Sequence, residues 1–552
     1  MGVEGLSLLM FVVACGVLIL GFPVAFSLAG TGLAFALLGN LAHDFDLRLL
    51  GGLASRYFGI MVNEVLVAVP MFVFMGVMLE RAKIAEQLLE TMGLLFGRMR
   101  GGLALSVIFV GMVLAASTGI VGATVVTMGL LSLPSMIKAK YDPRLACGVI
   151  CASGTLGQII PPSVVLVLLG DMLQGAYAEA QRATGNWAPA PLSVIDLFAG
   201  AILPGMLLVG LYMTWVLIKA IVDPAASPAL VSKSATVEGL GRRVVDALLP
   251  PAALMFAVLG SILAGIATPT EAAAVGCIGA LLLSSRVVGR SKGDEAVRTV
   301  HRFFWSRPWA LLLFIGRRLD NGSQRSITAA GFALCAQIVL HMLFDLRMGR
   351  EVLPWPDVAA FVLAVALSAV VLRGLLVALA RVYEAGILAE VMRSTTSISS
   401  MVFVILLGAS VFSLVFRGLG GDRVVAEVLN GLPGGAAGAM VAVMAVMFVL
   451  GFFLDFIEII FVVVPIVGPI LLQQGIDPLW FGIMIAINLQ TSFLTPPFGF
   501  ALFYLRGVAP PSITTLHIYR GVVPFVCIQL AGLAIVALFP QLVTWLPRVL
   551  FR

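Results

Sequence analysis

A polar stretch inside an apolar run, residues 152–163, combines hydroxyl groups and glycines with a double proline. It carries Ser153, Gly154, Thr155, Pro161 and Pro162. Proline has no N–H, and its ring clashes with the preceding helical turn, so backbone carbonyls upstream lose their helical partners. Carbonyl and hydroxyl oxygens are the hard ligands that Na⁺ needs. The stretch therefore predicts a broken helix with free oxygens near Gly157 and Gln158.

A second stretch of the same kind occupies residues 488–497. Its polar residues and prolines are Asn488, Thr491, Thr495, Pro496 and Pro497. Polar oxygens again cluster just ahead of a double proline, which predicts a second broken helix with cation ligands. The alternative for each stretch is an ordinary proline-kinked span whose hydroxyls bond to their own backbone.

Two further stretches, residues 115–124 and 451–458, join apolar runs that are too short to cross a bilayer alone. The first contains Ser117, Thr118 and Gly119, and the second contains Asp455 and Glu458. We interpret both as the tips of re-entrant hairpins. Carboxylates within a membrane are costly and mark functional sites. Asp455 is expected either to ligate a cation or to cap the helix that follows, and Glu458 to act as a helix N-terminal charge.

Helix N-termini at these tips and after the double prolines would favour a carboxylate substrate. No arginine lies inside the predicted core, although Arg417 and Arg506 flank it. The partner of such a carboxylate is therefore not assigned. Asn63 and Glu64 are interpreted as structural residues.

The composition places these stretches in a membrane. Of the 552 residues, 61% are hydrophobic and 11% are charged, and the mean hydropathy is +1.10. A soluble domain is about half apolar and a quarter charged, so this chain requires the bilayer as its solvent. The net charge of +6 is explained by basic loops on the cytoplasmic side rather than by nucleic-acid binding. Residues 286–325 are expected to be such a loop, and residues 171–196 a periplasmic one.

Motifs for several other activities are missing from the sequence. It contains no G-x-x-x-x-G-K-[ST] loop for nucleotide binding and no H-E-x-x-H zinc motif. An intramembrane aspartyl dyad would need a second acid at the repeat position of Asp455, which is Ile120. We therefore expect no enzyme activity and no nucleotide cofactor.

The chain contains a weak internal repeat. Asp142 with Pro143 and Asp477 with Pro478 are separated by 335 residues, as are the two double prolines. Pro23 and Pro269 open two further comparable runs. Carriers built from two such halves place their site near the bilayer midplane, where discontinuous helices of both halves meet. The predicted fold is an all-α polytopic membrane protein, an inverted-repeat transporter with two re-entrant hairpins and two broken helices.

Together these motifs resemble the large membrane subunit of tripartite ATP-independent periplasmic (TRAP) transporters. The resemblance rests on residues 116–136, 154–163, 268–274, 454–455 and 475–497, and covers most of residues 1–285 and 375–552. The basic segment 286–373 departs from the usual pattern. The resemblance implies an elevator-type mechanism with co-transported Na⁺. It maps the Na⁺ and adjoining substrate site onto Ser117, Thr118, Gly119, Ser153, Gly154, Thr155, Asp455, Asn488, Thr491 and Thr495.

The resemblance also implies a domain organisation and partners. The expected parts are N-terminal scaffold helices (1–100), a first transport half (101–195), scaffold helices (196–285), a basic cytoplasmic insertion with an extra apolar segment (286–373), scaffold helices (374–430), a second transport half (431–510) and a C-terminal helix (511–552). The expected partners are a small four-helix membrane subunit, a periplasmic substrate-binding protein and the lipids of a bacterial inner membrane. The expected substrate is a C4-dicarboxylate, a 2-oxo acid or a similar monocarboxylate.

Two other transport interpretations stay open at this stage. A Na⁺-coupled anion carrier that works without a binding protein has the same features within this chain. A passive channel fits less well, because unequal hairpins and a repeat suit alternating access better than a symmetric pore.

Overall fold

The protein is all-helical wherever its structure is described. The computed structural model describes residues 3–97, 99–188, 191–229, 240–291, 323–344, 346 and 354–551, and these contain helices but no strand. Within that part of the chain, nine helices are long and apolar enough to cross a membrane, or ten if the bent pair α19–α20 counts as one span. The predicted class, an all-α polytopic membrane protein, is confirmed.

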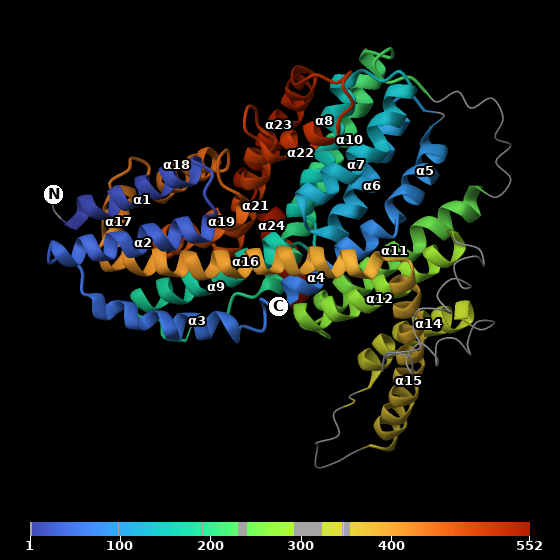
Figure 1. Ribbon diagram of the computed structural model, residues 1–552, viewed down its shortest axis with the longest axis horizontal. Coiled ribbons are helices and arrows are strands. Elements are labelled where there is room, and N and C mark those ends of the chain that lie inside the picture. The colour runs from blue at the N-terminus through green and yellow to red at the C-terminus, as the bar shows by residue number, and fades with distance from the viewer. Residues whose placement is uncertain are drawn as a thin grey trace. The chain divides into compact units, whose positions relative to one another are not determined.

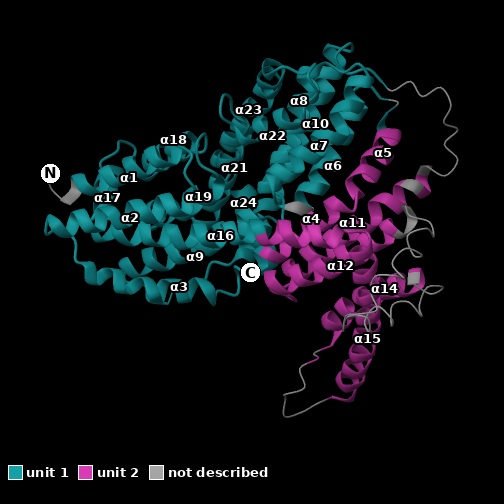
Figure 2. Ribbon diagram, viewed as in Figure 1, with its two compact units in different colours: residues 1–69, 96–231, 397–552 teal, residues 70–95, 232–396 magenta. Residues whose placement is uncertain are grey.

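The helices fall into two compact units, one formed by residues 1–69, 96–231 and 397–552 and the other by residues 70–95 and 232–396 (Figure 2). The first unit contains the α-helices α1 (Val3–Ile19), α2 (Val24–Leu41), α3 (Leu53–Met61), α6 (Gly102–Thr118), α7 (Val121–Lys138), α8 (Pro143–Thr155), α9 (Val164–Ala183), α10 (Val194–Val222), α17 (Gly421–Asn430), α18 (Gly435–Leu450), α19 (Phe456–Val462), α20 (Val464–Gln473), α21 (Pro478–Leu494), α22 (Phe500–Val508), α23 (Thr515–Leu538) and α24 (Gln541–Phe551) (Figure 1). It also contains two short 3₁₀ helices, η1 (Leu47–Gly52) and η2 (Leu156–Gln158). The second unit holds most or all of α4 (Ala68–Arg81), α5 (Ile84–Phe96), α11 (Leu240–Leu263), α12 (Pro269–Ser291), α14 (Ser323–Leu343) and α15 (Trp355–Glu384), and α16 (Ile387–Gly418) has residues in both.

The helix boundaries repeat at the spacing seen in the sequence. The pair α19–α20 covers the same residues as α7 when shifted by 335, and α21 begins 335 residues after α8. Asp142 and Asp477 cap these two equivalent starts, accepting hydrogen bonds from the backbone N–H groups of Arg144 at 2.8 Å and Trp480 at 2.9 Å. The Asp-Pro pair thus fixes the helix starts in both halves, because aspartate caps orphan N–H groups and proline needs none at the first turn.

Each half contains a helical hairpin followed by a broken helix. The first hairpin is α6 and α7, and the second is α18 followed by α19 and α20, which are bent by 54° relative to each other. The first break runs through η2 to residue 163, and the second covers residues 495–499. Both double prolines lie in these breaks, and both have a cis peptide bond. The local backbone pattern predicted from the prolines is therefore present.

Helices of the first half pack against helices of the second half. Helix α8 of the first half packs on α23, and α21 of the second half packs on α10. In the same way α7 packs on α22, while α20 packs on α9. Capping boxes start both α10, at Ser193 and Asp196, and α23, at Thr514 and His517. This crossed arrangement brings the end of α8 close to the end of α21.

The expected periplasmic loop at residues 171–196 is shorter than predicted. Helix α9 continues to Ala183, so Asp171 and Glu179 lie on a helix. Their neighbours include Ala, Gln, Glu and Met, which favour helix despite the polar composition. The helix stops just before Gly185, whose φ of +86° is left-handed.

The second unit holds the segment expected to be an insertion. Two helices of membrane-spanning length, α14 and α15, lie partly or wholly within residues 286–373 and pack on each other and on α12. Most of the basic stretch predicted to be cytoplasmic, residues 292–322, lies outside the described residues. The division of the chain into scaffold and transport parts stays a prediction.

A valine at Gly148 tests the packing of α8 on α23. A Cβ atom at Gly148 would overlap the Gly521 carbonyl, and a Cβ atom at Gly521 would overlap the Arg144 carbonyl. Overpacking costs about 1–3 kcal/mol, so we expect Gly148→Val to lower the apparent Tm of the detergent-solubilised chain. Gly210→Val is the control, since a Cβ atom there meets nothing within 4 Å. Equal Tm values for the two variants would contradict this packing.

Candidate functional site

The tips of both hairpins lie against the breaks of their own half. Gly119 ends α6 with a φ of +60°, and a Cβ atom placed on it would come within 3.1 Å of the Val164 nitrogen at the start of α9. In the second half, the ring centroid of Phe453 in the tip is 5.3 Å from that of Phe498 in the break. A tip and a break therefore meet once in each half, as the hairpin interpretation requires.

The two helix ends that precede the breaks also meet each other. The Gln490 side-chain amide donates to the Thr155 hydroxyl at 3.3 Å, and the two residues are 335 positions apart. Neither side chain has exposed surface. Ser153, Thr491 and the other predicted hydroxyl residues around them are also buried or half-buried. The structure thus brings the two predicted polar stretches together inside the protein.

The hydroxyl groups in these stretches donate to their own helices. Ser153 donates to the Ile150 carbonyl at 3.1 Å, Thr155 to Ala152 at 2.9 Å, Thr491 to Ile487 at 2.8 Å and Thr495 to Thr491 at 2.7 Å. Such back-bonding was the alternative considered for an ordinary kinked span. It uses each hydroxyl proton and leaves the oxygen lone pairs to accept a hydrogen bond or to ligate a cation.

Asp455 caps a helix in this structure. Its carboxylate accepts from the Phe456 N–H at 2.7 Å, and the Glu458 carboxylate accepts from the Asp455 N–H at 2.9 Å, which completes a capping box. Glu458 is only 6% exposed. The structure therefore gives both acids the capping roles considered from sequence, and a cation-ligating role for Asp455 stays a prediction.

The structure gives hydrogen-bond partners for some of the remaining predicted site residues and leaves the side chains of others undescribed. Asn488 donates through Nδ2 to the Met444 carbonyl at 2.8 Å, which leaves its Oδ1 to accept or ligate. The Gln158 carbonyl, expected to be free, accepts from the Ser163 hydroxyl at 2.8 Å. The side chains of Ser117 and Thr118 lie outside the described residues, although the backbone there completes α6.

Two residues at the meeting point were missed by the sequence analysis. Gln529 on α23 donates through Nε2 to the Tyr212 hydroxyl at 2.7 Å and to the Thr155 hydroxyl at 3.4 Å. Gln490 also approaches the Tyr212 hydroxyl, at 3.5 Å. Tyr212 and Gln529 have no exposed surface. Polar side chains within long apolar helices are the signal that would have indicated them.

The residues of this site do not include a metal-binding cluster of the usual protein kind. Among the residues that the structure describes, no three His, Cys, Asp or Glu side chains are grouped to hold a metal ion. The donors at the meeting point are instead hydroxyl, amide and carbonyl oxygens. Such neutral oxygens suit a transported alkali cation better than a tightly held transition metal.

Comparison with known families identifies the class of protein. The sequence profile described as the tripartite ATP-independent periplasmic transporter, DctM component, matches residues 10–307 and 321–542. The chain belongs to this DctM family. The resemblance inferred from the motifs is thus confirmed, and the DctM chain is a multi-pass component of a transporter rather than an enzyme.

Individual relatives agree with the family. The chain is 26% identical to the C4-dicarboxylate TRAP transporter large permease protein DctM of Vibrio cholerae, over 98% of this chain and 97% of the relative. It is 26% identical to the Rhodobacter capsulatus protein of the same name, over 99% of both. It is 24% identical to the sialic acid TRAP transporter large permease protein SiaM of V. cholerae, over 97% of this chain and 96% of the relative.

A solved structure is similar only at a low level. The YdaH transporter of Alcanivorax borkumensis aligns with 90% of this chain and 88% of its own, at 14% identity and a TM-score of 0.49. A likeness of this size carries no argument about the site.

Tyr212→Phe tests the hydrogen bonds that join α10 and α23 to the ends of α8 and α21 in the DctM chain. Without the Tyr212 hydroxyl, the buried Gln529 amide keeps only its longer bond to Thr155. Leaving a buried donor short of a partner costs about 1–3 kcal/mol, so the apparent Tm should fall. Tyr57→Phe is the matched control, because the Tyr57 hydroxyl has no hydrogen-bond partner in the described parts of the chain. An unchanged Tm for Tyr212→Phe would show that these bonds do not stabilise the fold.

Proposed function

We propose that this DctM chain is the permease of a Na⁺-coupled system that imports a small organic acid across the bacterial inner membrane. The observation that carries the proposal is the contact between the ends of two repeat-related helices, α8 and α21, at Thr155 and Gln490, each just ahead of a break. Helix ends that meet beside breaks supply oxygens from both halves at one buried point, which is the arrangement that secondary carriers use to bind coupling ions.

The chemistry of the donors supports Na⁺ as the coupling ion. The hydroxyls of Ser153, Thr491 and Thr495 are oriented by their bonds to the backbone and retain lone pairs. The Thr155 oxygen accepts from Gln490 and Gln529, so it would ligate an ion by giving up one of these two long bonds. Together with the Asn488 amide oxygen, the backbone oxygen of Gly154, and the tip containing Ser117, Thr118, Gly119 and Asp455, these hydroxyls form the proposed Na⁺ and adjoining substrate site. Pro161, Pro162, Pro496 and Pro497 keep the backbone unwound beside it.

The driving force is large enough without a nucleotide. Moving one positive charge through 100 mV contributes about 2.3 kcal/mol. Two or more Na⁺ ions carried with a monovalent anion would bring net positive charge inward and add their own concentration gradients. We propose that the transport part moves as an elevator, so that this site faces each side of the membrane in turn.

The substrate class and the partners follow from the family. The relatives are named for C4-dicarboxylates, sialic acid and ectoine, and we propose a C4-dicarboxylate, a 2-oxo acid or a similar monocarboxylate for this chain. Large permeases of this family work with a small permease subunit and a periplasmic binding protein. We propose that the small subunit has four helices, that it braces the scaffold, and that the binding protein delivers the acid.

Two substitutions test the proposed Na⁺ site. Thr155→Val removes one oxygen, and Asp455→Asn removes a charge while keeping a good N-cap residue. We expect each to reduce Na⁺-dependent uptake in proteoliposomes, with the two partners present, by at least about tenfold, the equivalent of about 1.4 kcal/mol.

Matched controls distinguish the loss of a Na⁺ ligand from a loss of fold stability in this test. Thr155→Ser keeps the hydroxyl and should retain uptake, whereas Asp455→Asn should keep the Tm of the wild-type chain. Normal uptake with unchanged Na⁺ dependence in both Thr155→Val and Asp455→Asn would remove these residues from the site.

A second test distinguishes a system of large permease, small permease subunit and binding protein from a carrier that works alone. The reconstituted chain alone should take up a panel of organic acids poorly, and adding the small subunit and binding protein should restore uptake. The physical reason is that the acid reaches the permease from the binding protein. Full activity of the chain alone would favour the stand-alone Na⁺-coupled anion carrier.

A further inference from the structure

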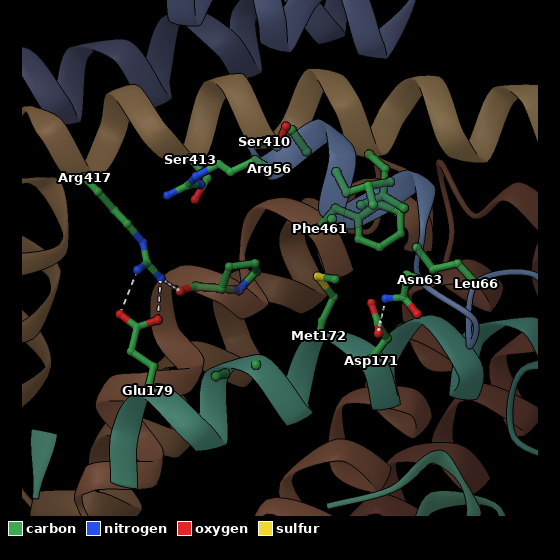
Figure 3. Close-up of a pocket in the computed structure, with 17 residues that line it drawn as sticks. Arg56, Asn63, Leu66, Asp171, Met172, Glu179, Ser410, Ser413, Arg417 and Phe461 are labelled. Atoms are coloured by element: carbon green, nitrogen blue, oxygen red, sulfur yellow. Dashed lines mark hydrogen bonds and ion pairs between the residues drawn. The ribbon is translucent and has the colours of Figure 1, made fainter. Parts of the chain in front are cut away.

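A cavity of about 390 Å³ lies in the first unit (Figure 3). Its walls come from α3 and the turn after it, α9, α16 and the α19–α20 pair. Small-molecule pockets range from about 300 to 1,000 Å³, so the cavity has room for a small organic acid. The repeat motifs did not indicate it.

Two helices line the cavity with one face each. Helix α16 contributes Leu406, Ala409, Ser410, Ser413 and Arg417, and α9 contributes Asp171, Met172, Gly175, Ala176 and Glu179. Both sets recur at spacings of three and four residues, which place side chains on one side of a helix. Most of the residues that line the cavity are apolar. The charged residues are few, so the hydrogen-bond partners of each can be given in turn.

Both acids in the cavity already have partners. Glu179 accepts from both terminal nitrogens of Arg417, at 2.7 and 3.0 Å, and Arg417 also donates to the Pro465 carbonyl at 2.8 Å. Asp171 accepts from the Asn63 amide at 2.8 Å. Figure 3 shows these two pairs at different places along α9.

One cation in the cavity has no hydrogen-bonded partner. Arg56 makes no hydrogen bond and no ion pair within 4 Å in the described parts of the chain, and the Ser413 hydroxyl makes no hydrogen bond there. The charges that act on Arg56 are Arg417 and Glu179, and Glu179 is already bound to Arg417. Arg56 is half-buried and Ser413 is 6% exposed. Ser413 lies one turn before Arg417 on α16, and Arg417 is within electrostatic range of Arg56. A partly desolvated guanidinium that shares its counter-ion with a second arginine is unfavourable, and its fork of N–H groups fits a carboxylate or a phosphate.

We infer that Arg56 and Ser413, with Arg417 at the same end of the cavity, bind the carboxylate of a small organic acid. The apolar side chains Leu66, Met172 and Phe461 line the cavity for the carbon skeleton. Glu179 competes with the acid for Arg417, because it already holds both terminal nitrogens. This inference rests on the proposed function and supplies the carboxylate partner that the sequence did not assign.

Direct binding to the full chain, purified with its small subunit, tests the inference. The chain is placed in nanodiscs of phosphatidylcholine only, and succinate and pyruvate are titrated by calorimetry. We expect Arg56→Gln to raise the Kd at least tenfold for each acid that the wild-type chain binds. Glu179→Gln should lower the Kd severalfold, because it frees Arg417. A merely structural role for these residues would not produce opposite signs.

Three further variants keep the binding test specific. Arg182→Gln changes an exposed arginine of α9 that does not line the cavity, and its Kd should stay within twofold of wild type. Ser413→Ala should weaken binding less than Arg56→Gln does. Arg56→Lys keeps the charge without the fork, should give an intermediate Kd, and replaces Arg56→Gln if the latter fails to fold.

Each adverse outcome overturns the inference. It fails if Arg56→Gln binds as Arg182→Gln does, or if the wild-type chain binds neither acid. It also fails if native mass spectrometry finds Arg56-dependent retention of phosphatidylglycerol while both acids fail to bind, because the occupant is then a lipid headgroup.

Uptake assays separate this inference from the proposed function. Na⁺-driven uptake with an unchanged KM in Arg56→Gln would overturn the carboxylate site and leave the proposed function standing. Wild-type uptake without any need for Na⁺ would overturn the proposed function regardless of Arg56.

Discussion

A break in a membrane helix exposes backbone groups that lipid cannot satisfy, so the protein itself must surround the break. Here each break is covered by a hairpin tip, and its carbonyls find partners nearby. The Gln158 carbonyl accepts from the Ser163 hydroxyl, and the Pro497 carbonyl accepts from the Tyr519 hydroxyl at 2.9 Å. The crossed packing of α8 on α23 and of α21 on α10 then places the first break in the interior, whereas the second is partly exposed at Pro497 and Phe498. The position of the site is a consequence of where unwound backbone is tolerated.

The parts of this arrangement that could be predicted from sequence are those set by local backbone chemistry. Asp142 and Asp477 mark helix starts because aspartate followed by proline suits the first helical turn, and the structure has helices beginning there. The double prolines mark the breaks for the same kind of reason. The offset of 335 residues then predicted that the two polar stretches are equivalent, and the bond between Thr155 and Gln490 joins them.

The parts that could not be predicted depend on which helices meet. Tyr212 and Gln529 have no motif, and their importance arises only because α10 and α23 both reach Thr155. Arg56 lies far from the repeats in sequence, and α3 brings it to the cavity. The length of α9 was misjudged because its polar residues were taken as a loop, whereas they line a cavity on one face of a helix.

The two helical elements that border the cavity on one side also begin at the proposed Na⁺ site. Helix α9 starts directly after the first break and carries Glu179, and α19 starts at the Asp455 cap and carries Phe461. Close-packed helices move as rigid elements rather than deforming continuously. A cation that changed the backbone at either start would therefore shift a wall of the cavity, and an acid held at Arg56 and Arg417 would resist or favour that shift. Because linkage is reciprocal, this geometry gives a direct physical path by which Na⁺ and the organic acid would each change the affinity for the other.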